Sequence, residues 1–210
     1  IEVLRGPFST IYGNHAGGVI QLFSREGKGS PTVGGGVLGG SWGTSKIDAG
    51  VEGQVGNTGY LINASRFDTN GYREHSAATR DQAFAKLNFV PDEDSKLALV
   101  AATLNQDDTQ DPLGINWKTY RDSPRSADPV AIAFDTRKSI DHTQGGANYE
   151  RRFGPGVLQL TAYAGTRSVT QYQAIPVVAQ LNPRSSGGVV DFDREFHGMA
   201  ARWIHTLTAG

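Results

Sequence analysis

The chain has 210 residues, of which 27 are glycine, one is methionine and none is cysteine, and its formal net charge is −1. The absence of cysteine excludes a disulfide framework and a thiolate ligand or nucleophile, and the balanced charge gives no support for nucleic acid as a partner, since phosphate binding needs a basic excess on some face. No stretch approaches the roughly 18 consecutive apolar residues of a transmembrane helix, and no charged-then-apolar signal peptide opens the chain.

The chain opens with a dense glycine and proline motif. Residues 1–13 read IEVLRGPFSTIYG, and residues 16–20 read AGGVI. Gly6 and Gly13 suit a positive φ angle or the close approach of another backbone, and Pro7 suits the first turn of a short helix that ends before Gly13. This opening piece ends near Phe23, because residues 24–31 (SREGKGSP) have the composition of a polar, flexible connector.

From about residue 32 onward, apolar and polar residues alternate. Residues 47–55 carry apolar residues or glycine at odd positions, with Asp, Gly, Glu and Gln at even ones. Later segments repeat the pattern, with two exceptions: Phe84 falls on a polar face and Arg151 falls on an apolar face. The expected apolar faces are Ala83, Ala85, Leu87 and Phe89; Ala147, Tyr149 and Phe153; Leu158, Leu160, Ala162 and Ala164; and Met199, Ala201 and Trp203. This period of two predicts about eight strands, each with one apolar and one polar face.

The connections between these strands alternate in length. Residues 56–59, 91–94 and 154–156 form tight turns, whereas residues 68–80, 106–141 and 169–194 are long and polar. An up-and-down barrel of the outer membrane has short turns on one rim and long loops on the other, and such loops are unusual in a compact soluble domain unless they are functional. The predicted fold is therefore all-β: part of an antiparallel transmembrane β-barrel, open and curved as a sheet.

The opening motif resembles the end of the plug domain of TonB-dependent outer-membrane receptors. The family pattern there reads I-E-V-x-R-G-P-x-S-x-x-Y-G, followed by two glycines and an apolar strand. The resemblance implies that residues 1–26 end a plug, that 27–31 are a connector, and that 32–210 are the N-terminal part of a barrel, so that the chain is a piece of a longer protein. The motif residues are expected to pack and dock the plug, with Arg5 bonded to carboxylates of the barrel wall; they are Arg5, Gly6, Pro7, Tyr12, Gly13, Gly17 and Gly18.

Several further segments resemble one subfamily, the receptors that take up pyrroloquinoline quinone. They include residues 12–14 (YGN), 71–76 (GYREHS) and 120–125 (YRDSPR), and the likeness continues in short segments as far as Gly198. His15 departs from it, since a small serine is expected there. This resemblance implies a planar tricarboxylate ligand, and a ferric-siderophore receptor of the same family is the alternative.

The long loops contain the candidate ligand-binding residues. Arginine forks pair bidentately with carboxylates and aromatic faces stack on planar rings, so together they suit a planar anionic ligand. For any single one of these residues, the alternative is that it packs the loops together. The candidates are Arg73, His75, Trp117, Tyr120, Arg121, Arg125, Tyr172 and Arg184.

Metal binding and catalysis have no comparable pattern. The five histidines lack a ligand spacing, and the acidic runs at 92–94 and 107–111 lack the glycine and terminal glutamate of an EF-hand. Neither Ser41 nor Ser45 lies in a G-x-S-x-G elbow. We therefore expect no metal, no cofactor and no enzyme activity. The alternatives of another class are a barrel-embedded hydrolase, a passive porin and a soluble β-rich binding domain.

The resemblance implies a function in active transport. A TonB-dependent receptor imports a scarce ligand across the outer membrane of a Gram-negative bacterium. The expected partners are a small anionic ligand, outer-membrane lipid, and the TonB complex, which the family contacts through an N-terminal segment that this chain does not contain.

Overall fold

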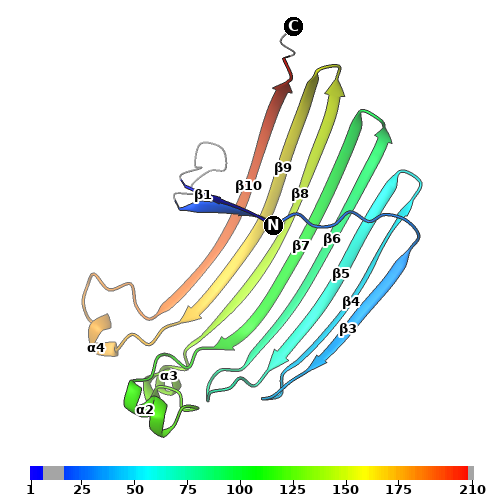
Figure 1. The fold of residues 1–210 in the computed structure, drawn as a ribbon. Coiled ribbons are helices and arrows are strands. Elements are labelled where there is room, and N and C mark those ends of the chain that lie inside the picture. The colour runs from blue at the N-terminus through cyan, green and yellow to red at the C-terminus, as the bar shows by residue number, and fades with distance from the viewer. Residues whose placement is uncertain (7–16, 208–210) are drawn as a thin grey trace.

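The computed structural model describes residues 1–6 and 17–207, which form two antiparallel sheets (Figure 1). The small sheet pairs β1 (Glu2–Arg5) with β2 (Gly18–Gln21). The large sheet is open and curved, and its eight strands lie side by side in chain order, which confirms the expected number and the all-β antiparallel class. They are β3 (Thr32–Gly39), β4 (Ser45–Val55), β5 (Thr58–Thr69), β6 (Ala78–Asp92), β7 (Ser95–Gln110), β8 (Arg137–Phe153), β9 (Gly156–Tyr172) and β10 (Val189–His205).

The connections differ between the two rims of the large sheet. Three two-residue turns, at 56–57, 93–94 and 154–155, join the strands at one rim, as predicted. The other rim carries loops 40–44, 70–77, 111–136 and 173–188, of which only the first is short. All three long loops are shorter than expected, because the strands beside them continue past the region of apolar alternation. Their backbone ladders extend through residues that are polar on both faces, which the alternation does not detect.

Three short helices lie within the long loops, where no helix was predicted. They are α2 (Trp117–Asp122), α3 (Pro129–Phe134) and α4 (Val177–Gln180). Asn116 caps α2 by accepting a bond from the Thr119 amide, and Asp128 caps α3 in the same way ahead of Pro129. Helices of four to six residues are too short to show a helical period. None of the helices in residues 1–6 and 17–207 is long and apolar enough to cross a membrane.

Cross-strand register assigns each side chain to a face of the large sheet. Directly paired residues point the same way. Residues 22–31 join the two sheets and are called the connector from here on; they contact Lys86 and Lys96, so these lysines mark the concave face. The predicted apolar faces, including that of Leu160, all lie on the opposite, convex side. Phe84 points to the concave side, and Arg151 lies at the turn end of the convex side with its guanidinium 5.4 Å from the Phe153 ring centre.

The large sheet is a single layer with very little core. Only four apolar residues of the described chain are buried, namely Leu61, Ala127, Ala131 and Val169. On the convex side Leu160 is 40% exposed and Met199 is 89% exposed. The sheet therefore depends on its backbone ladder, and its apolar face requires a cover that the chain itself does not supply.

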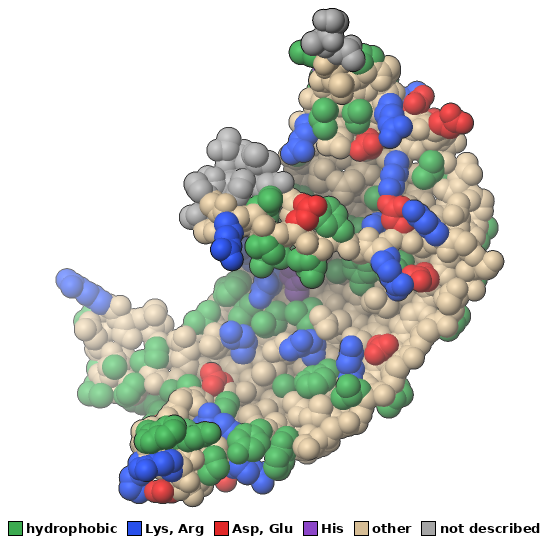
Figure 2. All heavy atoms as spheres, viewed as in Figure 1, with side chains coloured by type: hydrophobic (Ala, Val, Ile, Leu, Met, Phe, Trp, Pro, Cys, Tyr) green, Lys and Arg blue, Asp and Glu red, His purple; other side chains and the backbone are tan. Residues whose placement is uncertain are grey.

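The β1–β2 hairpin extends from the connector over the concave side (Figures 1 and 2). Gly6 has a φ of 119°, and a side chain at Gly18 would collide with the Leu4 carbonyl oxygen, so both positions favour glycine. Gly17 precedes β2 in open space. Arg5 pairs with Gly18 through the backbone, and it forms no ion pair with any carboxylate of the described residues. Pro7, Tyr12, Gly13 and His15 lie outside the described residues.

Candidate ligand-binding surface

Arg73 lies at the centre of the loop rim and ties two loops together. Its guanidinium donates to three backbone carbonyls of loop 111–136: Nη1 to Leu113 at 2.6 Å, Nη2 to Pro112 at 3.2 Å, and both Nη2 and Nε to Ser126 at 2.8 and 3.0 Å. The side chain is half-buried. Arg73 thus uses most of its donors on the protein itself, as the packing alternative expected.

His75 fixes the same two loops from the other side. Its Nε2 lies 2.8 Å from the Thr136 carbonyl oxygen, which can only accept, so the imidazole carries a proton on Nε2. Thr136 is buried, and its hydroxyl donates to the Asp111 carbonyl at 2.6 Å. His75 also has a φ of 54°, which is unusual for a residue with a side chain and is held here by these contacts.

Arg125 joins a third loop to this cluster. Its guanidinium lies 4.2 Å from the centre of the Trp42 ring, and its Nε donates to the Tyr72 carbonyl at 3.2 Å. The rings of Trp42 and Tyr72 meet edge to face at 5.4 Å. Trp42 was not among the predicted site residues, and the signal that could have identified it is an aromatic residue in a glycine-rich rim turn. We call Trp42, Tyr72, Arg73, His75 and Arg125 the loop cluster.

The other predicted residues lie apart from the loop cluster. Trp117 and Tyr120 stack on α2 with ring centres 5.3 Å apart, and they are 67% and 51% exposed, so they present a flat surface to solvent. Arg121 is exposed on the same helix. Tyr172 ends β9, where the guanidinium of Arg137 lies 3.8 Å from its ring centre.

Arg184 lies in loop 173–188, beyond α4. Only its backbone amide is bonded within the described chain, to Asn182 at 2.9 Å. The eight candidates therefore divide into three that tie loops together, three displayed on α2, and two near the β9–β10 loop. The structure does not gather all of them into one pocket.

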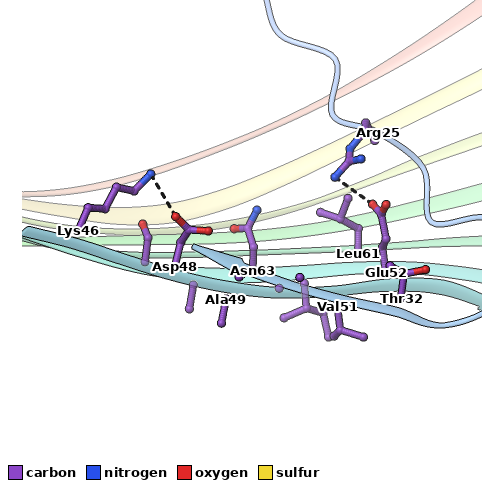
Figure 3. Close-up of a pocket in the computed structure, with 15 residues that line it drawn as sticks. Arg25, Thr32, Lys46, Asp48, Ala49, Val51, Glu52, Leu61 and Asn63 are labelled. Carbon is purple, nitrogen blue, oxygen red and sulfur yellow. Dashed lines mark ion pairs between the residues drawn. The ribbon is translucent and has the colours of Figure 1, made fainter. Parts of the chain in front are cut away.

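The connector is fixed to the concave wall by charged side chains. Arg25 pairs with Glu52 of β4 at 3.1 Å (Figure 3). Lys86 of β6 donates to the Ser24 carbonyl at 3.2 Å, and Glu26 pairs with Lys96 of β7. The hydrogen bond from Lys96 is the largest cause that lowers the pKa of Glu26 below its ordinary value. Three strands thus hold the connector across the wall.

A close backbone approach strengthens this attachment. Gly27 is buried, and a side chain there would collide with the Tyr60 carbonyl oxygen. A side chain at Gly59 would collide in turn with the Gly27 carbonyl oxygen. Both positions therefore require glycine because the two backbones touch.

The connector leaves a polar hollow of about 440 Å³ against strands β3 to β5. Lys46, Asp48 and Asn63 point into it from the wall, while Ala49 and Val51 point to the convex side (Figure 3). Lys46 and Asp48 lie 3.8 Å apart and neutralise each other. The hollow can accommodate polar groups but has no excess charge to select an ion.

The acidic residues of the rim are used within the structure. Asp108 accepts bonds from Arg137 and Ser139, and Asp111 accepts from the Leu113 amide. No group of three or more potential metal ligands is present within residues 1–6 and 17–207.

Comparisons with known proteins identify the fold. No known family profile matches the sequence. Among solved structures, the chain is similar to the crystal structure of ferric citrate transporter FecA in the unliganded form, with a TM-score of 0.65 and 16% sequence identity. The match covers 86% of this chain and 26% of the transporter chain, so this chain spans about a quarter of that protein. At this identity the likeness establishes that the curved sheet has the fold of part of such a barrel.

Proposed function

We propose that the chain is the end of a plug and the first part of the barrel of a TonB-dependent outer-membrane receptor, which imports a scarce ligand into a Gram-negative cell. One observation carries the proposal: a curved meander holds its own N-terminal connector across its concave side through Arg25, Glu26 and Gly27. In the proposed division, residues 1–26 end the plug, 27–31 link it to the barrel and 32–210 begin the barrel, so residues 22–31 comprise the last residues of the plug and this link. The motif at residues 1–18 supports the same family.

The convex side supports outer-membrane lipid as a partner. Aromatic residues Tyr149, Phe153 and Trp203 lie on it near the turn rim. Toward the loop rim the apolar band ends at Thr143, next to a polar row that crosses six strands; the row is Arg66, Asp81, Asn105, Asp141, Ser168 and Asp193. The ten residue steps from Thr143 to Phe153 correspond to about 25 Å along a tilted barrel, the usual height of such a band.

We infer that the ligand is planar and anionic, with pyrroloquinoline quinone as the first candidate. The subfamily likeness of residues 71–76 and 120–125 supports it, as does the exposed ring pair of Trp117 and Tyr120. A ferric siderophore is the second candidate, because the similar structure is a ferric citrate transporter. Arg73, His75 and Arg125 then serve mainly to hold the loops that present the contact residues, among which we include Arg121, Tyr172 and Arg184.

A passive porin and a barrel-embedded hydrolase are less consistent with these observations. The connector and hairpin occupy the concave side that a pore would leave open. Receptor import needs no covalent chemistry, since the ligand is bound, a plug is remodelled and the ligand is released on the other side. Energy coupling in this proposal comes from the TonB complex, which would bind a segment beyond this chain.

The test compares uptake by the complete receptor in cells with and without a functional TonB complex. Pyrroloquinoline quinone and several ferric siderophores are supplied at nanomolar concentration, and binding to the purified receptor is measured in parallel. TonB-dependent uptake of the quinone is expected. Uptake of a siderophore alone would replace the ligand and keep the transporter, whereas uptake that is independent of TonB would refute the proposed function.

A further inference from the structure

Three basic or ionisable side chains form one row on the concave face. Arg167 of β9 is the direct partner of Arg194 of β10 on one side and of His142 of β8 on the other. The register of β8, β9 and β10 is continuous. His142 lies an even number of residues from Glu150 on β8, so both point to the same face, and Glu150 is the direct partner of Lys96, which contacts the connector on the concave side. All three side chains therefore point toward the inside of the proposed barrel, where Figure 2 shows basic side chains in the hollow behind the hairpin.

The two arginines have no counter-ion in the described chain. Both side chains are exposed, and neither guanidinium forms a hydrogen bond, an ion pair or a cation–π contact with any residue of 1–6 and 17–207. Like charges directly opposite each other on neighbouring strands destabilise a sheet. By contrast Arg66, Arg73, Arg125 and Arg137 all have partners.

Carboxylates close in sequence cannot neutralise the pair. Asp141 and Asp193 flank His142 and Arg194, but the pleat directs them to the convex side, where Asn105 and Ser168 bond them. The only carboxylate in the same concave row is Asp48, on β4 at the far side of the sheet, and it already pairs with Lys46. The positive charge of the row thus faces the interior without compensation.

A stacked aromatic pair, which we call the floor, joins the row of Arg167 and Arg194 to the next concave row along the strands. Gly165 of β9 has no side chain, and this allows Phe196 of β10 to reach across and stack on His142 of β8, with ring centres 5.6 Å apart and planes at 8°. A side chain at Gly165 would collide with the Phe196 ring. The Nδ1 atom of His142 is buried and has no hydrogen-bond partner in the described chain, so the row also holds an unsatisfied polar atom.

We infer that Arg167 and Arg194, with the His142–Phe196 floor, form a wall subsite for a ligand that carries at least two carboxylates. Each guanidinium takes one carboxylate bidentately, and a planar framework between the carboxylates packs on the floor. Arg167 lies five residues inside the external end of β9, about 13 Å below the loop rim in a tilted strand. The inference rests on the proposed function and names the chemical class of its ligand.

The test uses the complete receptor in detergent with three probes: pyrroloquinoline quinone, ferric citrate and an uncharged ferric trihydroxamate. Binding is measured by calorimetry for the wild type, Arg167→Gln, Arg194→Gln and the charge-keeping Arg194→Lys. Arg202→Gln is the matched control, because Arg202 is also exposed on the concave face of β10 and lies opposite Gln159. Each glutamine variant should bind at least one of the two polycarboxylates about 10-fold more weakly or worse, with a shallower salt dependence. Arg194→Lys should lose less, and Arg202→Gln should bind as the wild type does.

Four outcomes would overturn the inference. Polycarboxylate affinity that stays unchanged in both glutamine variants would do so, as would an equal loss for the uncharged probe. Lower thermal stability with unchanged affinity would assign the arginines to carboxylates of the plug instead. If the wild type binds and imports only the trihydroxamate, the polycarboxylate subsite is wrong and the proposed transporter stands, whereas the absence of TonB-dependent uptake of any probe refutes the transporter itself.

Discussion

Replacing Arg73 by alanine tests whether one side chain holds the loop cluster together. The change removes four hydrogen bonds and leaves three carbonyls of loop 111–136 without their donor. At about 1 kcal/mol for each carbonyl in this half-exposed setting, the loops should lose about 3 kcal/mol of local stability. The sheet should be unaffected, because its ladders do not depend on this guanidinium.

Hydrogen exchange of the complete protein measures this local opening. The Glu74 amide bonds to the Arg125 carbonyl at 2.8 Å, so it reports on the contact between the two loops. The Asp128 amide bonds to the Pro112 carbonyl at 3.0 Å, so it reports on the closure of loop 111–136 itself. A loss of about 3 kcal/mol should speed their exchange on the order of 100-fold. Arg121→Ala, which removes an exposed arginine of loop 111–136, is the matched control and should have no effect. Unchanged exchange in Arg73→Ala would mean that the four bonds do not hold the loops.

Other outcomes concern the connector and the convex face. Gly27→Ala should detach the connector, because the new methyl group collides with the Tyr60 carbonyl oxygen. Proteolysis at residues 22–31 should then be faster than in the control variant Ser24→Ala. Equal cleavage rates in the two variants would contradict the close approach of the two backbones. Lys96 lowers the pKa of Glu26 below the ordinary 4.5, so this pair should stabilise docking fully above pH 4.5 and lose its effect as pH falls through the lowered pKa. The rate of proteolysis at the connector, measured as a function of pH, should rise as the pH falls through the lowered pKa of Glu26. Glu26→Gln should remove this dependence on pH. Leu160→Arg should destabilise the barrel by about 2–4 kcal/mol in bilayer refolding titrations. Ala200→Arg is the control, because Ala200 points to the concave side. An equal loss of stability in both variants would contradict the assignment of Leu160 to the lipid-facing side.

The strands were predictable because their information is local. Alternation with a period of two indicates the strand and its apolar face together, so the convex positions of Leu160 and Met199 could be inferred from their neighbours. The tight turns at 56–57 and 154–155 were equally local, since glycine marks both. Where residues are polar on both faces, as near Gln110 and Arg137, the alternation stops although the backbone ladder continues, and the predicted loops were too long for that reason.

The loop cluster could not be predicted, because it depends on contacts between residues far apart in the chain. Arg125 packs on Trp42 although strands β4 to β7 separate the two residues in the chain, and no spacing in the sequence indicates this contact. Arginines in loops indicated recognition, yet the donors of Arg73 go to backbone carbonyls that any sequence would supply. Composition identifies which side chains are able to bind an anion, whereas the path of the neighbouring loop determines which of them remain free.

The register of β8 to β10 separates charges that the sequence places side by side. Asp193, Arg194 and Glu195 are consecutive, so the segment looks nearly neutral along the chain. In the sheet, the two carboxylates point to the convex side and the guanidinium to the concave side, opposite Arg167. Because the side-chain period is two, a slip of one residue in β10 would exchange these faces and direct acids at the wall subsite. The 17 continuous pairs between β9 and β10 therefore do more than stabilise the sheet, since they determine the sign of the charge that a ligand of the proposed subsite would meet.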